Sequence, residues 1–103
     1  MGGAPAATAL AVARDHPAYE GHFPGNPILP GVVILAEAMA AIAKATSIPV
    51  EQWVVSSTKF LEPVTPGMPL TLAHERLAGG GVRFEVRSPS GVVAAGVLAS
   101  RPR

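Results

Sequence analysis

The residues best suited to chemistry in this chain are one histidine in a constrained loop and one carboxylate in the apolar run that follows the loop. His22 lies within residues 21–31 (GHFPGNPILPG), which contain three prolines and three glycines. Prolines restrict φ and glycines allow turns that other residues resist, so a rigid loop is expected around this histidine. Glu37 is the lone charged residue of the apolar run 32–43. A histidine on a rigid loop that leads into a buried helix with a single acid is typical of a catalytic site.

A metal centre is not expected at this position, and no cofactor is expected either. His22 and Glu37 would supply two ligands, which are too few for a protein metal site. The chain has no cysteine, which excludes thiolate ligands and disulfides. The other histidines, His16 and His74, are expected to be structural or solvated.

Composition limits the class of protein. A chain of 103 residues predicts a single domain, 1–103, with a small core. Apolar residues make up 49% and charged residues 15%, so we expect a helix buried on all sides and a face buried against a partner. The net charge of +1 argues against nucleic acid as a partner. No apolar run is long enough for a membrane span, and no signal peptide is evident, so a cytoplasmic protein is expected.

Hydrophobic patterning predicts the elements that must position His22 and Glu37. A helix is expected from residue 31 to about residue 46, because alanine and leucine favour it. Its apolar residues occupy every face, which predicts a helix surrounded by protein, with Lys44 at its solvent end. Trp53 and Phe60 are expected in the core or in a tunnel wall. Strands are expected at 8–14, 51–61, 70–76, 82–87 and 92–100, with turns at 63–67, 79–81 and 88–91.

The arrangement of these elements follows from the short turns between the later strands. Residues 82–87 alternate cleanly, with apolar residues on one face and charged residues on the other. Consecutive strands joined by short turns are antiparallel. A long apolar helix followed by such a meander predicts an α+β fold, in which a curled antiparallel sheet of about five strands wraps the helix.

Three segments resemble a known family. Residues 21–32 (GHFPGNPILPGV) and 37–40 (EAMA) are similar to the β-hydroxyacyl-acyl-carrier-protein dehydratases of the hotdog fold. A second match is residues 59–67 (KFLEPVTPG). With the strand order around them, these motifs cover most of the chain from about Asp15 onward.

The resemblance implies both an assembly and a reaction. It implies a homodimer whose sheets join edge to edge, with two active sites at the interface. Each site would use a histidine of one chain and a helix carboxylate of the other. The implied substrate is an acyl chain on the phosphopantetheine arm of an acyl carrier protein. The implied reaction removes water from the 3-hydroxyacyl thioester and gives the trans-2-enoyl thioester.

This chemistry assigns roles to residues of the loop. A neutral imidazole is a suitable base for the α-proton, which is the role implied for His22. The N–H group of Gly31 or Val32, at a helix N-terminus, would stabilise negative charge on the thioester oxygen. Phe23 and Pro30 complete the implied substrate-binding set. A carboxylic acid kept protonated by burial would protonate the departing hydroxyl.

The acid is where this sequence departs from the family pattern. The family's acid falls at Ala36, and Glu37 comes one residue later, about 100° further around a helix. A one-residue π-bulge between Val32 and Glu37 would restore the direction. Alternatively, Glu37 enters the site from another angle, or other carboxylates compensate. A third interpretation is a site that binds the thioester without dehydrating it. Separately, Glu37 could have a purely structural role, as a carboxylate at a dimer or domain edge that pairs with an arginine.

Three functions therefore stay open at the level of sequence. The first is a 3-hydroxyacyl thioester dehydratase with His22 and Glu37 as its catalytic residues. The second is a non-catalytic partner subunit of a dehydratase heterodimer, and the third is a hotdog acyl thioesterase. The following cations are expected to form a solvated face, or alternatively a docking patch for an acidic carrier protein: Lys44, Lys59, Arg83 and Arg87.

Overall fold

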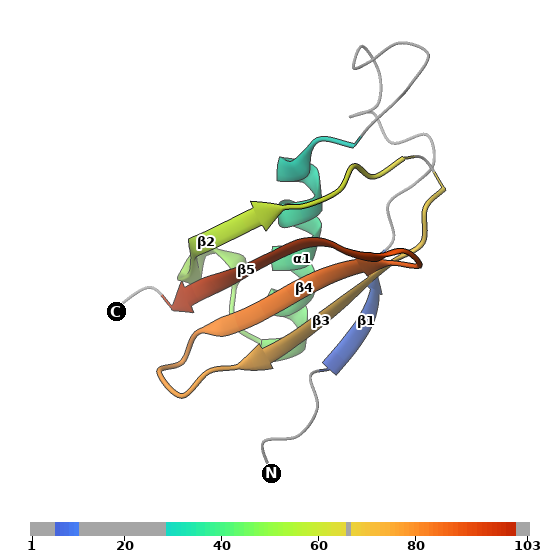
Figure 1. The fold of residues 1–103 in the computed structure, drawn as a ribbon. Coiled ribbons are helices and arrows are strands. Elements are labelled where there is room, and N and C mark those ends of the chain that lie inside the picture. Colours follow the sequence, from blue (N-terminus) through green and yellow to red (C-terminus); the bar gives the residue numbers. More distant parts are fainter. Residues whose placement is uncertain (1–5, 11–28, 66, 101–103) are drawn as a thin grey trace.

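The computed structural model describes residues 6–10, 29–65 and 67–100. The loop residues His22 and Phe23 lie outside these ranges, as does the part of the predicted first strand beyond Leu10. The described residues form one helix, one short 3₁₀ turn and one sheet (Figure 1).

The sheet is antiparallel throughout and has the strand order β1-β3-β4-β5-β2. The predicted meander is confirmed for β3, β4 and β5, but it was wrong for β2, which pairs with β5 rather than with β3. Strand β5 occupies the interior position expected of its apolar sequence. The prediction for the first strand was wrong at its start, because the strand begins at Ala6 rather than at residue 8. The strands are β1 (Ala6–Leu10), β2 (Trp53–Phe60), β3 (Leu70–Arg76), β4 (Val82–Ser88) and β5 (Gly91–Ser100).

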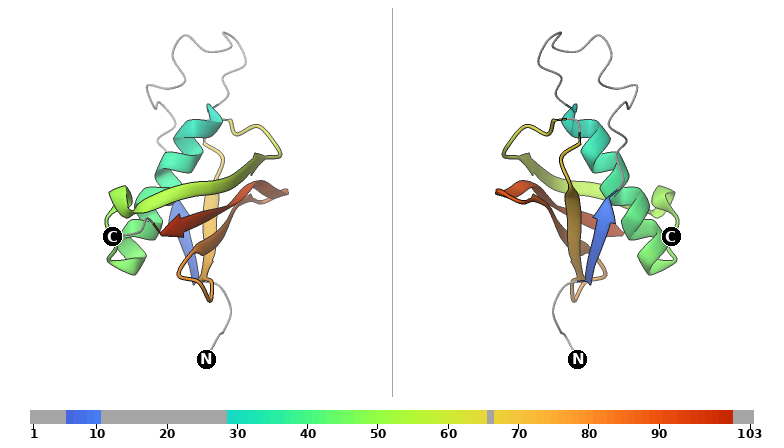
Figure 2. Two further views of the ribbon diagram at one scale, coloured as in Figure 1. Left: turned by 90° about the vertical axis from the view of Figure 1, so that its left-hand side faces the viewer. Right: turned by 90° about the vertical axis from the view of Figure 1, so that its right-hand side faces the viewer.

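Helix α1 (Gly31–Thr46) has the predicted bounds and lies against one face of the curved sheet (Figure 2). It begins directly after Pro30, which is the extended N-cap residue, and none of the described side chains caps its first N–H groups. It ends at Ser47, which adopts the left-handed conformation with φ of 59°. A short 3₁₀ helix, η2 (Val50–Gln52), then leads into β2.

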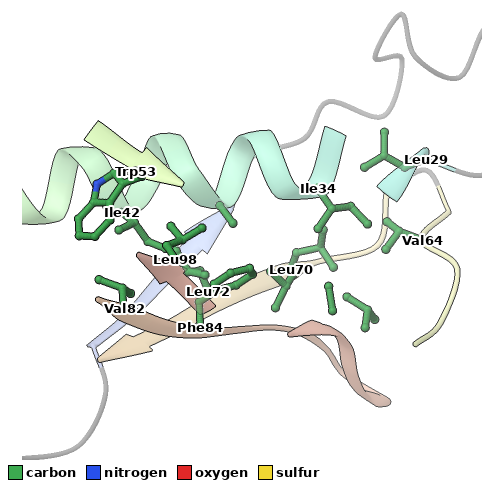
Figure 3. Close-up of a cluster of buried hydrophobic side chains, with 14 residues drawn as sticks. Leu29, Ile34, Ile42, Trp53, Val64, Leu70, Leu72, Val82, Phe84 and Leu98 are labelled. Carbon is green, nitrogen blue, oxygen red and sulfur yellow. The ribbon is translucent and has the colours of Figure 1, made fainter. Parts of the chain in front are cut away.

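The core lies between α1 and the inner face of the sheet (Figure 3). Strand alternation builds it, because every second residue of β3 and β4 points toward the helix. The helix contributes its i, i+4, i+8 row, Ile34, Ala38 and Ile42. Trp53 is buried near the helix C-terminus, as predicted for a core residue, whereas Phe60 at the other end of β2 is 49% exposed.

The prediction that α1 is surrounded by protein was wrong for the single chain. Val32 is 69% exposed, and Ala36, Ala40 and Lys44 continue an exposed row along the helix. A lone sheet can cover only one side of a helix, so the opposite side stays open. The apolar composition of that side points to further contacts outside the chain.

Gly96 on β5 is expected to be intolerant of any side chain. An added Cβ would overlap the Ser57 carbonyl oxygen and lie 2.8 Å from Thr58 Oγ1 and 2.9 Å from Phe84 Cε1. The Gly96→Ala variant should therefore lose about 1–3 kcal/mol of unfolding free energy, measured by urea titration. Gly79→Ala is the matched control, since its Cβ would meet nothing within 4 Å. Equal stability of the two variants would contradict this assignment.

Candidate active site

A pocket of about 290 Å³ opens at the N-terminal end of α1. The helix contributes Gly31 and Ile34, and the segment after β2 contributes the outer wall. Its lining is Leu29, Gly31, Ile34, Phe60, Leu61, Glu62 and Pro63. The pocket thus joins the end of the His22 motif to the second family motif, which are about thirty residues apart in the chain.

Two contacts fix the segment after β2 against the start of the helix. The Leu29 N–H donates to the Val64 carbonyl at 2.8 Å. The Phe60 ring packs so closely on Gly31 that an added Cβ at Gly31 would lie 2.9 Å from ring atoms. Glycine at position 31 therefore lets the aromatic ring approach the helix backbone. In addition, the Leu61 N–H donates a hydrogen bond to the Val93 carbonyl at 2.8 Å, which holds the segment against β5.

The start of the helix provides hydrogen-bond donors beside this pocket. The first N–H groups of any α-helix, here those of Gly31 and Val32, have no acceptor within the helix. The Val33 N–H is used by the Pro30 carbonyl at 3.0 Å. The first turn carries no acidic residue. Such a helix end stabilises negative charge. A thioester carbonyl oxygen gains negative charge when a proton leaves the adjacent α-carbon, so this end of the helix suits that reaction.

Glu37 does not point to this pocket. Helix α1 is regular from Gly31 to Thr46, so the π-bulge interpretation was wrong. Glu37 is half-buried on the side of the helix that faces β1, where it lines a separate hollow of about 490 Å³ with Ala9 and Leu10. Ala36, where the resemblance puts the acid, lies on the exposed row.

A carboxylate that the sequence analysis did not single out does line the pocket. Glu62 is the second residue after β2 and lies between Phe60 and Val64, the two residues whose contacts hold this segment to the helix start. The only sequence signal for it was its place inside the second motif, 59–67. That signal did not show which surface its side chain would reach.

The remaining predicted residues are located as follows. His74 is buried on the inner face of β3, in agreement with a structural role. The four cations predicted to be solvated are all exposed. Arg83 pairs with Glu75 at 3.0 Å and Arg87 with Glu85 at 2.8 Å, on the outer face of the sheet. Among the described residues, no cluster of ligand side chains could hold a metal ion.

A long helix held against a single curled antiparallel sheet is the hotdog fold, and the predicted fold class is confirmed. The family model described as ApeI dehydratase, of the ApeI-like group, matches residues 3–97. The chain belongs to this ApeI-like dehydratase family.

Relatives and solved structures agree with that assignment. The chain is 39% identical over 95 residues to the 3-hydroxyacyl-[acyl-carrier-protein] dehydratase FabZ of Acetivibrio thermocellus, covering 82% of this chain and 64% of that protein. It is 42% identical over 76 residues to FabZ of Nitratidesulfovibrio vulgaris, covering 64% and 48%. The chain thus spans between about half and two thirds of the length of these relatives.

Two solved structures share the architecture. An uncharacterized protein from Erwinia carotovora subsp. atroseptica superposes with a TM-score of 0.68 at 26% identity, covering 93% of this chain and 80% of that one. A chain of the dehydratase heterocomplex ApeI:P from Xenorhabdus doucetiae superposes with a TM-score of 0.73 at 24% identity, covering 96% and 88%. Within the described ranges, no helix has the length and apolarity that crossing a bilayer requires.

Proposed function

We propose that this chain, as a single hotdog domain, removes water from a 3-hydroxyacyl thioester to give the trans-2-enoyl thioester. The observation that carries the proposal is the pocket at the start of α1, where the first turn of the helix meets apolar walls and a carboxylate. Family membership and the names of the FabZ relatives support it. Those relatives also support an acyl carrier protein as the bearer of the substrate.

The reaction divides among three groups. His22 removes the α-proton as a neutral imidazole. The N–H groups of Gly31 and Val32 stabilise the charge that develops on the thioester oxygen. A carboxylic acid protonates the hydroxyl as the carbon–oxygen bond breaks, so that the oxygen leaves as water. Phe23 and Pro30 remain the proposed substrate contacts from the loop, and the sequence assigned the acid to Glu37.

We also propose that the chain works as a homodimer joined through β2. This strand is an edge of the sheet formed by the described strands, and an edge strand exposes N–H and C=O groups that a further strand can pair with. Its apolar side chains are unusually exposed, with Val54 at 41% and Val55 at 39%. Leu61 and Val32 extend the same apolar character to the pocket and the helix start. Pairing of two β2 strands would cover this surface and bring two pockets to one interface.

A second candidate function is a partner subunit in a heterodimer of dehydratase-like chains. Two observations favour it. The Glu37 side chain lies on the side of the helix that faces β1, and the position to which the resemblance assigns the acid is occupied by the exposed Ala36. The heterocomplex ApeI:P provides a precedent for such an assembly within the fold. The cytoplasmic location inferred from the sequence stays a prediction in either case.

Turnover by the purified chain tests the proposal. A 3-hydroxyacyl thioester on a carrier protein or a pantetheine analogue is supplied, and the enoyl product is measured by mass spectrometry. Free thiol is measured in the same reaction. Enoyl product supports a dehydratase, whereas free thiol without enoyl product would establish a thioesterase instead. Absence of both, with activity restored by a second homologous subunit, would favour the partner function.

A further inference from the structure

We infer that Phe60 is a positioning residue for the proposed dehydration, because its ring holds the start of α1 at the wall of the pocket. The inference rests on the proposed function and goes beyond it, since the roles of base, hydrogen-bond donor and acid all belong to other residues. Three observations carry it: the contact of the ring with Gly31, the attachment of Phe60 to the interior of the sheet, and the exposure of the ring.

The ring of Phe60 lies against the backbone of Gly31. An ideal Cβ at Gly31 would lie 2.9 Å from Cδ1 and Cε1 of the ring and 3.0 Å from Cγ. Three neighbouring ring atoms at nearly equal distances indicate that the ring presents its face to the glycine rather than its edge. The helix start therefore cannot approach β2 more closely without a clash, and no side chain fits at position 31 unless the ring moves.

Phe60 is itself held by the interior of the sheet. It is the last residue of β2 and pairs with Ala94 of β5, which is almost fully buried. The next residue, Leu61, donates its N–H to the Val93 carbonyl at 2.8 Å. The ring thus connects a strand inside the sheet to the first residue of α1.

The position of Gly31 matters for the proposed reaction because its N–H is one of the two assigned to the thioester oxygen. Hydrogen-bond donors stabilise a developing charge only when they are aimed at the place where it forms. The hydrogen bond from Leu29 to Val64 holds the chain before the helix, and Ile34 is buried in the core after its first turn. Phe60 contacts the residue between these two points, and it does so beside the pocket.

A contribution to the core does not explain an aromatic ring at this position. Phe60 is 49% exposed, whereas the residues of the core are almost fully buried. The ring also lines the pocket, so one part of it contacts the helix start while another part borders the substrate space. A substitution at this position is therefore expected to change turnover more than stability.

The Phe60→Leu variant tests this role. Leucine keeps an apolar side chain but has no flat face to set against Gly31. We expect kcat for enoyl product to fall between about 10-fold and 100-fold, because small displacements of a reacting group have effects of this size. KM should change little, since the thioester oxygen gains its charge only on the way to the transition state. Val50→Ala is the control, because Val50 is a similarly exposed apolar residue, at 42%, in η2.

Two further variants separate positioning from packing. Phe60→Tyr retains the ring face, and the half-exposed position lets its hydroxyl reach water, so most of the turnover lost in Phe60→Leu should return. Gly31→Ala forces the ring away and should also lower kcat. Because both changes break the same contact, the double variant Gly31→Ala/Phe60→Leu should lose much less than the product of the two single losses. Losses that multiply would overturn the inference.

Sedimentation velocity and the thermal midpoint are measured for every variant. A loss of turnover in Phe60→Leu that only follows dissociation or unfolding would overturn the inference, since Phe60 would then act through assembly or stability. Full turnover in Phe60→Leu, next to an active unmodified chain, would also overturn it. An unmodified chain that forms no enoyl product would instead mean failure of the proposed function, and the inference would fall with it.

Discussion

The His22→Ala variant is expected to lose between about 100-fold and 10,000-fold in kcat for dehydration, while it keeps the fold. Removal of the α-proton from a thioester needs a base in its neutral form near pH 7, and imidazole is the side chain best suited to that task. General base catalysis typically contributes a factor of this size. The loss corresponds to about 3–5 kcal/mol of transition-state stabilisation.

The measurement is enoyl product formation at saturating substrate, together with the thermal midpoint of each variant. His16→Ala is the matched control, because His16 is the neighbouring histidine in the sequence and lies outside the 21–31 motif. It should retain the turnover of the unmodified chain. Equal turnover in His22→Ala and the unmodified chain would remove His22 from the mechanism. A similar loss in both variants would indicate a general effect on the segment that precedes α1.

The double variant Val54→Asp/Val55→Asp is expected to abolish self-association of the chain. Both valines lie on the free edge strand β2 and are about 40% exposed in the single chain. A dimer joined at this edge would have to bury two unpaired carboxylates per chain, which is costly. We expect the dimer dissociation constant to rise at least about 100-fold, equivalent to about 2.7 kcal/mol.

Sedimentation velocity over a concentration series measures this effect. Thr71→Asp is the control, since Thr71 is exposed on β3, which is separated from β2 by β4 and β5. If the active sites form at the interface, turnover per chain should fall in step with dissociation. A double variant that remains dimeric would show that β2 is not the interface, and one that dissociates with full activity would show that each chain is active alone.

Local sequence information was sufficient for most of the secondary structure. The helix was predicted at its observed bounds because a proline before Gly31 and a proline after Ile48 limit it. Strands β3 and β4 were predicted because their side chains alternate between a buried and an exposed face. The exposed row on α1 was not foreseen, since the sequence of an apolar helix does not reveal which side its own sheet covers.

The candidate site was predicted only in part. The 21–31 motif identified His22 and the helix start, because closely spaced prolines, glycines and a histidine are recognisable without any long-range contact. The direction of the Glu37 side chain could be known only from the structure. A one-residue offset in a helix either is compensated by a π-bulge or rotates the side chain to another side of the helix. In this chain the helix stays regular, and Glu37 turns toward β1.

The sequence by itself determined the elements, their alternation and the family to which the loop and helix belong, since these depend on neighbours within a few turns or strand residues. Only the tertiary structure decided which carboxylate reaches the pocket. Glu62 and Gly31 are brought together by the Phe60 ring and the Leu29–Val64 hydrogen bond, which join segments about thirty residues apart. Such contacts depend on how the strands pair and where the helix crosses them, and local pattern does not encode that geometry.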